Sequence, residues 1–376
     1  MTHRIYLDNN ASTSVDPRVL RAVVANMQES IGNSSAVHSF GQDARNQIAR
    51  ARRTIADFLG AKPQEIIFTS GGTEGINMMI RGLFSDASRP GHIITSSVEH
   101  ACVYNTVKHL EKQGCEATYL SPGLWGAVKP EDVQAAIRQN TRLILLMAVN
   151  NETGVKTDIE EIARIAHSAK IPFVVDAIAL LGKESFVIPE GVSAMCFSGH
   201  KIHAPSGIGA VFIRQGIRVT PLLFGGPQEY NRRGGTENVP GIIGFAEAIS
   251  ILKEIMPSSV VEIKRLRDRL EAGLMNRIPN IVINGQAPRV VNTSNISFPN
   301  VDGETLLMNL DLAGVAVSHG SACISGALEP SRVLLNMGIP MSQARSTIRF
   351  SLSRFTTEEE IDSCIEIISK LLKAGK

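Results

Sequence analysis

The sequence has few cysteines, few aromatic residues and no large excess of charge of either sign. Its 376 residues include only five cysteines and no CxxC pair, which argues against a disulfide framework and against a zinc site. The formal net charge is +2, and charges of both signs are interspersed, so we expect no binding of nucleic acid or of a membrane. These absences favour chemistry on a small molecule in a reducing cytoplasm, without a bound metal.

Long hydrophobic runs are also missing. The longest regular apolar run, LILLMAV at residues 143–149, is far too short to cross a bilayer. The first residues, MTHRIYLDNN, lead directly into an expected strand, so the sequence predicts no signal or transit peptide. The length of the chain favours one large domain and one smaller domain.

What the chain does contain, between about residues 65 and 213, is an alternation of short apolar runs and segments of helical periodicity. The runs include IIF, LILLMAV and FVVDA, which have the length of buried strands. This alternation is typical of an α/β fold whose sheet is mostly parallel. The sequence pattern changes after about residue 256, where a charged helical stretch leads to further strand-like runs. We therefore predict a large domain over residues 16–255 and a smaller α/β domain over residues 1–15 and 256–376.

Two stretches at expected strand ends suit a phosphate and a buried charge. SGGTEG at residues 70–75 precedes an apolar helix, and glycines beside the free N–H groups of a helix start suit a phosphate. The alternative is an ordinary glycine-rich turn. Asp176 ends another expected strand, at the edge where α/β sheets bind ligands. It is either a helix N-cap or a fixed anion that keeps a heterocyclic nitrogen protonated.

Lys201 lies in SGHKIH, a polar turn between two apolar stretches. It is either a solvated loop residue or a partly desolvated amine that forms a Schiff base with a carbonyl cofactor. A lysine, phosphate donors and an acidic partner for a ring nitrogen together indicate pyridoxal phosphate (PLP). His100 follows another strand and either caps a helix or stacks on a flat cofactor, and VNNETG offers Asn150 and Asn151 as donors. Cys323 stands among small residues in SHGSACISG, which favours a reactive thiol on a mobile loop.

Nine stretches together resemble the cysteine desulfurases of the NifS and IscS type, members of the class V aminotransferase family with the type I PLP-dependent transferase fold. The resemblance covers nearly the whole chain. In the family's order the stretches are YLDNNAS, GNSSAVHSFG, FTSGGTEGIN, VEH, VNNETG, SGHKIH, RRGGTENVPG, GSAC and IRFSLS. The resemblance implies an α/β fold with a mostly parallel central sheet flanked by helices, and a smaller domain that carries the catalytic-cysteine loop.

The resemblance also implies a role for each matching residue. Lys201 would bind PLP covalently, Asp176 would pair with the ring nitrogen, and His100 would stack on the ring. The implied phosphate ligands are Gly72, Thr73, Ser198 and His200, with Thr236 lent by the second subunit of a homodimer. The implied ligands of the substrate carboxylate are Arg349, Asn33 and Asn150, of which Asn150 would also contact the cofactor.

The activity implied by the resemblance is the conversion of L-cysteine to L-alanine. The catalytic residues would be Lys201, His100 and Cys323. Lys201 would move the α-proton of cysteine, and the thiolate of Cys323 would take the substrate sulfur as a persulfide. An iron–sulfur scaffold or another acceptor protein would then receive this sulfur, for iron–sulfur cluster assembly or thiolation.

One position departs from the family pattern. Where the family has a glutamine three residues after the aspartate, this chain has Ala179, so a donor to the ring oxygen of PLP is missing. Its loss would cost about 1.5 to 3 kcal/mol if nothing replaced it. The alternatives are therefore another class V PLP enzyme, such as a selenocysteine lyase or an aminotransferase, and a catalytically weak scaffold. An aminotransferase needs no thiol, so Cys323 favours the desulfurase.

Overall fold

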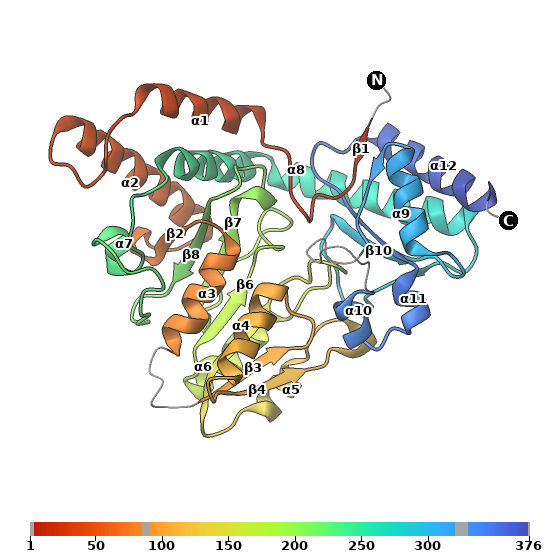
Figure 1. The fold of residues 1–376 in the computed structure, drawn as a ribbon, viewed down its shortest axis with the longest axis horizontal. Helices are drawn as coiled ribbons and strands as arrows, with labels where there is room; N and C mark the ends of the chain where they lie inside the picture. Colours follow the sequence, from red (N-terminus) through yellow and green to blue (C-terminus); the bar gives the residue numbers. More distant parts are fainter. Residues whose placement is uncertain (1–3, 85–90, 320–329, 375–376) are drawn as a thin grey trace.

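The computed structural model describes residues 4–84, 91–319 and 330–374, and its centre is a seven-stranded sheet (Figure 1). The strand order is β2-β8-β7-β6-β5-β3-β4. Only β8 runs antiparallel to its neighbours, and the remaining pairs are parallel. The strands are β2 (Ile66–Thr69), β3 (His92–Ser96), β4 (Glu116–Leu120), β5 (Thr141–Met147), β6 (Phe173–Asp176), β7 (Ala194–Ser198) and β8 (Gly209–Ile213). The prediction of a mostly parallel sheet in an α/β fold is confirmed.

Helices cover both faces of this sheet because its strands are apolar on both sides. On β2, Ile66 and Phe68 pack on one face of the sheet, whereas Ile67 between them packs on the other; the buried apolar side chains on both faces are together called the first cluster. Successive side chains of a strand point to opposite faces, so a continuous apolar run needs helices on each side. One face carries α1 (Pro17–Glu29), α2 (Ser39–Leu59), α6 (Ile159–Ala169) and the first part of α8 (Val239–Arg277), and the other carries α3 (Gly72–Leu83) and α4 (Ala101–Glu111).

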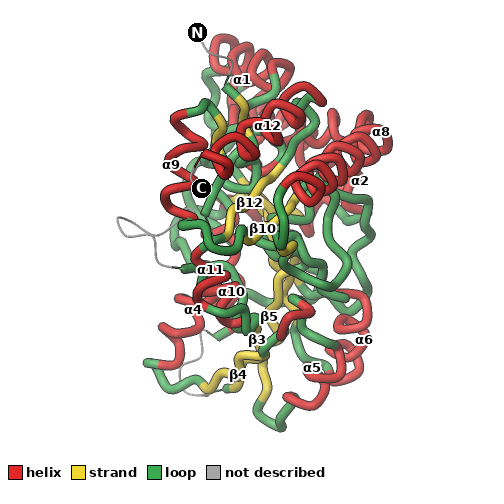
Figure 2. The backbone as a smooth tube through the Cα atoms, turned by 90° about the vertical axis from the view of Figure 1, so that its right-hand side faces the viewer, coloured by secondary structure: helices red, strands yellow, loops and turns green. Residues whose placement is uncertain are grey.

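A separate hydrophobic cluster lies around two small sheets. One sheet has the order β12-β10-β9 and is antiparallel, and the other pairs β1 with β11 in parallel. Figure 2 shows β10 and β12 above the end of the large sheet that contains β5, β3 and β4. These strands are β1 (Ile5–Tyr6), β9 (Val282–Ile283), β10 (Thr293–Ser297), β11 (Val315–Ala316) and β12 (Thr347–Ser351). The accompanying helices are α9 (Gly303–Leu312), α10 (Arg332–Asn336), α11 (Met341–Arg345) and α12 (Glu358–Ala374).

Ile5 and Leu7, near the start of the chain, pack in this second cluster with Ile348 and Phe350 of β12. Helix α8 contributes to both clusters, since Phe245 belongs to the first and Leu270 to the second. The predicted domain boundary near residue 256 therefore lies inside a continuous helix, beside Pro257. We retain the division into residues 16–255 and residues 1–15 with 256–376 as a proposal.

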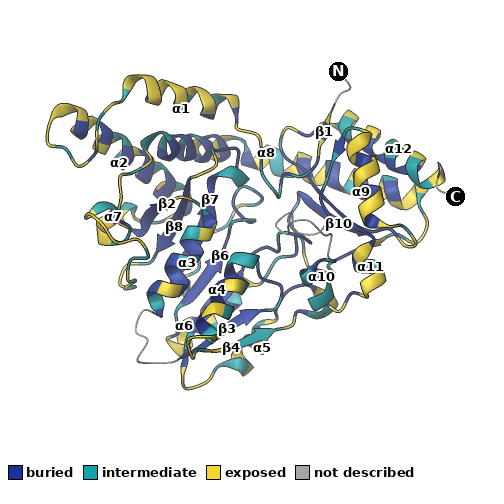
Figure 3. Ribbon diagram, in the orientation of Figure 1, coloured by how far each residue is buried: buried dark blue, intermediate teal, exposed yellow. Residues whose placement is uncertain are grey.

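The buried residues lie mainly in the two hydrophobic clusters, and many of the exposed residues lie on the outer helices. The strands of the large sheet are mostly buried, whereas the outer surfaces of α1 and α9 carry many exposed residues (Figure 3). Within residues 4–84, 91–319 and 330–374, no helix is both long and apolar enough to span a membrane. Two short helices complete the fold, α5 (Pro130–Ala136) and α7 (Gln228–Asn231), and α7 includes left-handed backbone at Glu229 and Tyr230.

Candidate active site

A cavity of about 280 Å³ lies at the carboxyl ends of the parallel strands. It is bordered by the last residues of β5, β6 and β7, by the turn after β3 and by the start of α3. Ligands of α/β sheets bind at this edge because the strand-to-helix loops converge there. Eight predicted site residues line it: Gly72, Thr73, His100, Asp176, Ser198, His200, Lys201 and Arg349.

The start of α3 forms one wall of the cavity. Helix α3 begins directly after Gly71, whose φ of 156° favours glycine, and no side chain caps it. A Cβ atom on Gly72 would lie 2.0 Å from Cδ1 of Ile178, so a side chain at this position would have to displace Ile178. The first N–H groups of a helix have no partners within the helix and carry its positive dipole end. With the hydroxyls of Thr73 and Ser198 on the same cavity, this wall suits a phosphate.

A buried carboxylate lies at the end of β6. Asp176 is 5% exposed, and its Oδ1 accepts a hydrogen bond from the backbone N–H of Ile178 at 3.0 Å. Burial raises the pKa of Asp176, while the charges of His100 and Lys201 act in the opposite direction. The side chain therefore caps a turn rather than a helix, and it also borders the cavity; its role as the partner of a ring nitrogen stays a prediction. A cation in the cavity would stabilise its ionised form.

His100 caps a helix and also lines the cavity. Its Nδ1 accepts a hydrogen bond from the backbone N–H of Cys102 at 3.2 Å and so caps α4. The ring also lines the cavity. Burial lowers the pKa of His100, so the imidazole is neutral near pH 7 and presents an aromatic ring rather than a cation.

Lys201 ends a short 3-10 turn, Gly199–Lys201, that follows β7. Its ammonium group donates to the backbone carbonyl of Asn10 and, at 2.9 Å, to that of Ala11. The segment after β1 therefore holds the lysine across the cavity. His200 precedes it, and burial together with the charge of Lys201 lowers the pKa of His200 to about 4. This histidine is a neutral donor or acceptor near pH 7.

Arg349 comes from β12, in the second cluster, and is 2% exposed. Its Nη2 forms an ion pair with Oδ1 of Asp8 at 2.7 Å, and its Nη1 donates to the backbone carbonyl of Asn151 at 3.1 Å. Among the described residues its Nε has no hydrogen-bond partner. The cavity thus contains a buried guanidinium group with an unsatisfied donor, which suits a carboxylate ligand.

Three predicted residues do not line this cavity, and a fourth lies outside the described part of the chain. Asn150 is buried beside it, but its side chain donates to the carbonyl of Val98 at 3.2 Å and accepts from the N–H groups of residues 152 and 153. Asn33 and Thr236 are exposed, and neither borders the cavity of this chain. Cys323 lies outside the described residues.

Two other residues border the cavity: one that the sequence offered only as a possible donor, and one to which it gave no site role. Asn151, the neighbour of Asn150 in VNNETG, lines it, and its buried Oδ1 has no partner among the described residues. Lys183, seven residues after Asp176, also lines it and belongs to no motif that would have identified it. Ala179 lies on the same wall, so the departure from the family pattern faces the site.

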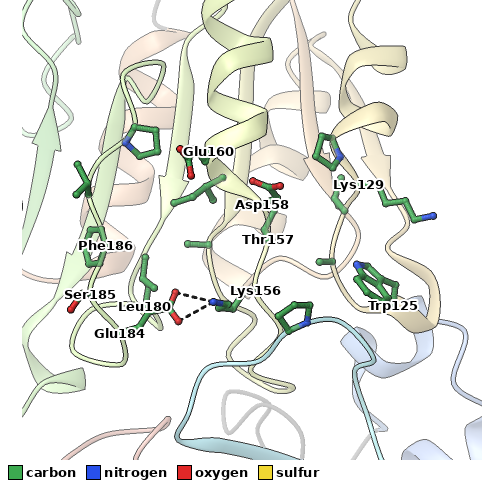
Figure 4. Close-up of a pocket in the computed structure, with 18 residues that line it drawn as sticks. Trp125, Lys129, Lys156, Thr157, Asp158, Glu160, Leu180, Glu184, Ser185 and Phe186 are labelled. Carbon is green, nitrogen blue, oxygen red and sulfur yellow. Dashed lines mark hydrogen bonds and ion pairs between the residues drawn. The ribbon is translucent and has the colours of Figure 1, made fainter. Parts of the chain in front are cut away.

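A larger cavity of about 920 Å³ lies elsewhere, between the start of α6 and the segment after β6 (Figure 4). Trp125 and Phe186 line it, and its Lys156 is already paired with Glu184 at 3.0 Å. None of the predicted site residues borders this cavity. The described part of the chain also contains no group of histidine, cysteine, aspartate and glutamate side chains that could hold a metal ion.

Comparison with known proteins agrees with this geometry. Residues 5–364 match the family model described as aminotransferase class-V. The chain is 46% identical over 371 residues to "Cysteine desulfurase 2" of Trichormus variabilis, an alignment that covers 98% of this chain and 93% of the relative.

Two solved structures are similar in sequence and in fold. One, titled "NIFS-LIKE PROTEIN", has a TM-score of 0.92 and 36% identity, and covers 99% of this chain and 100% of its own. The other, titled "SspA in complex with cysteine", has a TM-score of 0.83 and 35% identity, and covers 94% of this chain and 100% of its own. A family match and a likeness that both extend over nearly the whole chain lead to one conclusion: this protein belongs to the aminotransferase class-V family.

Proposed function

We propose that this protein is a PLP-dependent cysteine desulfurase, which converts L-cysteine to L-alanine and transfers the sulfur through Cys323 to an acceptor. The observation that carries the proposal is a single cavity bordered by a lysine, a buried carboxylate, a neutral histidine and a buried arginine. The names of the relatives support it, because they include cysteine desulfurase and a complex with cysteine.

The residues of the cavity fit PLP. The start of α3, where a Cβ atom on Gly72 would meet Ile178, would hold the phosphate with Thr73, Ser198 and His200. Asp176 would face the ring nitrogen, because a buried carboxylate with one backbone donor gains from a cationic partner. Bound PLP would supply an electron sink that stabilises negative charge on the α-carbon of an amino acid.

The chain's own residues would position the substrate and move its proton. Arg349 would hold the carboxylate of L-cysteine through its unsatisfied Nε donor, and the ion pair with Asp8 would fix the guanidinium group. Lys201 would attach the cofactor and then, as a free amine, take the proton from the substrate α-carbon. His100 would stack on the cofactor ring.

Sulfur transfer would then need one nucleophile and no added oxidant. The Cys323 thiolate would attack the substrate sulfur, and a new S–S bond would form while the substrate C–S bond breaks. The electron pair of the C–S bond would stay on the carbon skeleton, which becomes alanine after protonation. The persulfide on Cys323 would then pass its terminal sulfur to an acceptor protein, which we propose to be an iron–sulfur scaffold or a thiolation partner.

We further propose that the active form is a cytoplasmic homodimer. Thr236 lies on an exposed segment and borders no part of the cavity of its own chain. That position is compatible with a threonine that contacts the phosphate in the second subunit. Asn33 is likewise exposed, and we propose that it approaches the substrate only in the dimer.

Measurement of alanine and sulfide released from L-cysteine, in the presence of a reductant, tests the proposed activity. The purified protein should bind PLP and form both products. Cys323→Ala should abolish sulfide release without changing the PLP spectrum. The matched control is Cys115→Ala, since Cys115 is a free, partly buried cysteine that does not border the cavity. A protein that binds PLP but forms no alanine from cysteine would contradict the proposal.

A further inference from the structure

The cavity contains a second lysine close to the position that lacks the family's glutamine. Lys183 and Ala179 both line it, together with Lys201. We propose that Lys183 supplies the positive charge and the N–H donor that stabilise the ring oxygen of PLP in place of the side chain missing at position 179. The proposal rests on the proposed PLP cofactor. It identifies Lys183 as the residue that compensates for the donor missing at Ala179.

The turn after β6 brings Lys183 back to the cavity. The backbone N–H groups of Leu180 and Leu181 donate to the carbonyl of Ala177 at 3.1 and 3.2 Å, and that of Lys183 donates to Leu180 at 3.0 Å. Gly182 between them has a φ of 76°, which favours glycine. The chain therefore folds tightly on itself over these residues, and positions 179 and 183 share one cavity wall.

The ammonium group of Lys183 lies next to the residue that would bind the cofactor. Its Nζ is 3.4 Å from the backbone carbonyl oxygen of Lys201, to which it donates, and the side chain is 6% exposed. In PLP the ring oxygen is attached to the carbon adjacent to the one that carries the aldehyde. The Lys183 contact is to the backbone of Lys201, and both side chains line the same cavity, so the ammonium group of Lys183 is available to that oxygen from the cavity wall.

The surroundings of Lys183 leave its charge uncompensated. Among the described residues, the charged groups that act on it are Lys201 and Arg354, both cations, and His203 also lies close enough to respond to its charge. Glu184, its neighbour in the sequence, pairs with Lys156, and Asp16 pairs with Arg354, so neither of these carboxylates is paired with Lys183.

Burial, followed by the charge of Lys201, lowers the pKa of Lys183 to about 8. The carboxylate of Asp176 and the neutral rings of His100 and His200 border the same cavity. A buried ammonium group without an anion is unfavourable, so negative charge on a ligand in this cavity would stabilise it.

A cation beside the ring oxygen has a measurable electrostatic consequence. The oxygen is negatively charged and attracts a proton to the nitrogen that joins PLP to Lys201. A positive charge at Lys183 opposes this attraction and so lowers the pKa of that nitrogen. Removing the charge should raise this pKa by about one unit or more, because charges a few ångströms apart interact by several kcal/mol at an effective dielectric constant near 20.

The experiment is a pH titration of the visible absorbance of the PLP-loaded protein, with PLP content and dissociation measured in parallel. Lys183→Met should shift the titration midpoint upward by about one unit or more, and Lys183→Arg should stay close to wild type. Ala179→Gln should lower the midpoint of the Lys183→Met variant again, because the amide restores a donor on the same wall. Lys156→Met is the matched control, since that lysine borders the other cavity, and it should leave the midpoint unchanged.

A midpoint that stays within about 0.3 units of wild type in Lys183→Met would overturn the inference. So would a shift of equal size in Lys183→Arg, because a retained charge should retain the effect. If Lys183→Met does not retain PLP, rescue of PLP binding by Ala179→Gln supports the inference and absence of rescue refutes it. Alanine formation by the wild-type protein is a separate measurement, so the proposed function can hold while this inference fails.

Discussion

The perturbation with the clearest expected consequence for stability is Glu99→Gln. Glu99 precedes His100 in the turn after β3 and is completely buried. Its Oε1 accepts a hydrogen bond from the hydroxyl of Ser96 at 2.5 Å, and its Oε2 has no partner among the described residues. The substitution can keep an acceptor for Ser96 and removes the ability to ionise, while an amide NH2 group replaces the other carboxyl oxygen.

Burial raises the pKa of Glu99 from its ordinary 4.5 to about 8. Between these two pH values the folded protein keeps the proton while the unfolded chain loses it, so the free energy of unfolding falls as the pH rises. Each pH unit in this window is worth about 1.4 kcal/mol, so the free energy of unfolding falls by ~5 kcal/mol in total between pH 4.5 and pH 8. The stabilising contribution is complete below about pH 4.5 and is lost as the pH rises through about 8.

The assay is urea denaturation of wild type and Glu99→Gln at several pH values from 5 to 9. Other titrating groups are common to both proteins, so the difference between their free energies of unfolding isolates Glu99. We expect the free energy of unfolding of the variant, relative to that of the wild type, to rise by several kcal/mol over this range and to level off above about pH 8. A difference that does not change with pH, or that changes in favour of the wild type, would refute the reasoning.

Three further predictions concern charged groups that are buried in pairs or networks. Arg52→Met should lower the free energy of unfolding by about 3 to 5 kcal/mol in urea denaturation, because it leaves Glu229, now paired at 2.5 Å, as a buried unpaired carboxylate; a loss below about 1 kcal/mol would contradict this. Burial acts to raise the pKa of Asp16, but hydrogen bonds from Arg18 and Arg354 outweigh it and hold that pKa well below its usual range, so Asp16→Asn should be less stable than wild type at pH 7. Denaturation should show this difference shrinking as the pH falls below about 4, and a constant difference down to pH 3 would be inconsistent with it. Arg349→Lys should lower kcat/KM for L-cysteine roughly 10- to 150-fold, mainly through KM, because a lysine loses the planar fork that holds a carboxylate; steady-state kinetics with unchanged KM would argue against the assignment.

Much of the large sheet could be predicted from the sequence because its strands are continuous apolar runs. LILLMAV and FVVDA became β5 and β6, which are buried on both faces. Strand β4 (Glu116–Leu120) was not predicted, since it lies at the edge of the sheet, is only partly buried and has no strong apolar pattern. Helix α8 is longer than the charged stretch predicted after residue 256, because the chain remains helical through Pro257.

The candidate site could be predicted mainly where a motif placed a residue at a strand end. Asp176 and Ser198 are the last residues of buried strands, Lys201 lies in the turn after one of them, and all three border the cavity. The choice between Asn150 and Asn151 could not be made in this way. Adjacent residues in a turn point in different directions, and only the hydrogen bonds of Asn150 to its own turn show which amide is left for the cavity.

The sequence by itself determined the fold class and the residue types at the strand ends, because periodicity and motif order are properties of neighbouring residues. Only the tertiary structure decided which distant segments meet at the cavity. The carbonyls of Asn10 and Ala11 hold Lys201, and Arg349 reaches the site from another sheet with Asp8 as its partner. Lys183 enters the cavity through a tight turn that no motif marks. Such contacts depend on how the two hydrophobic clusters pack, which local sequence patterns do not encode.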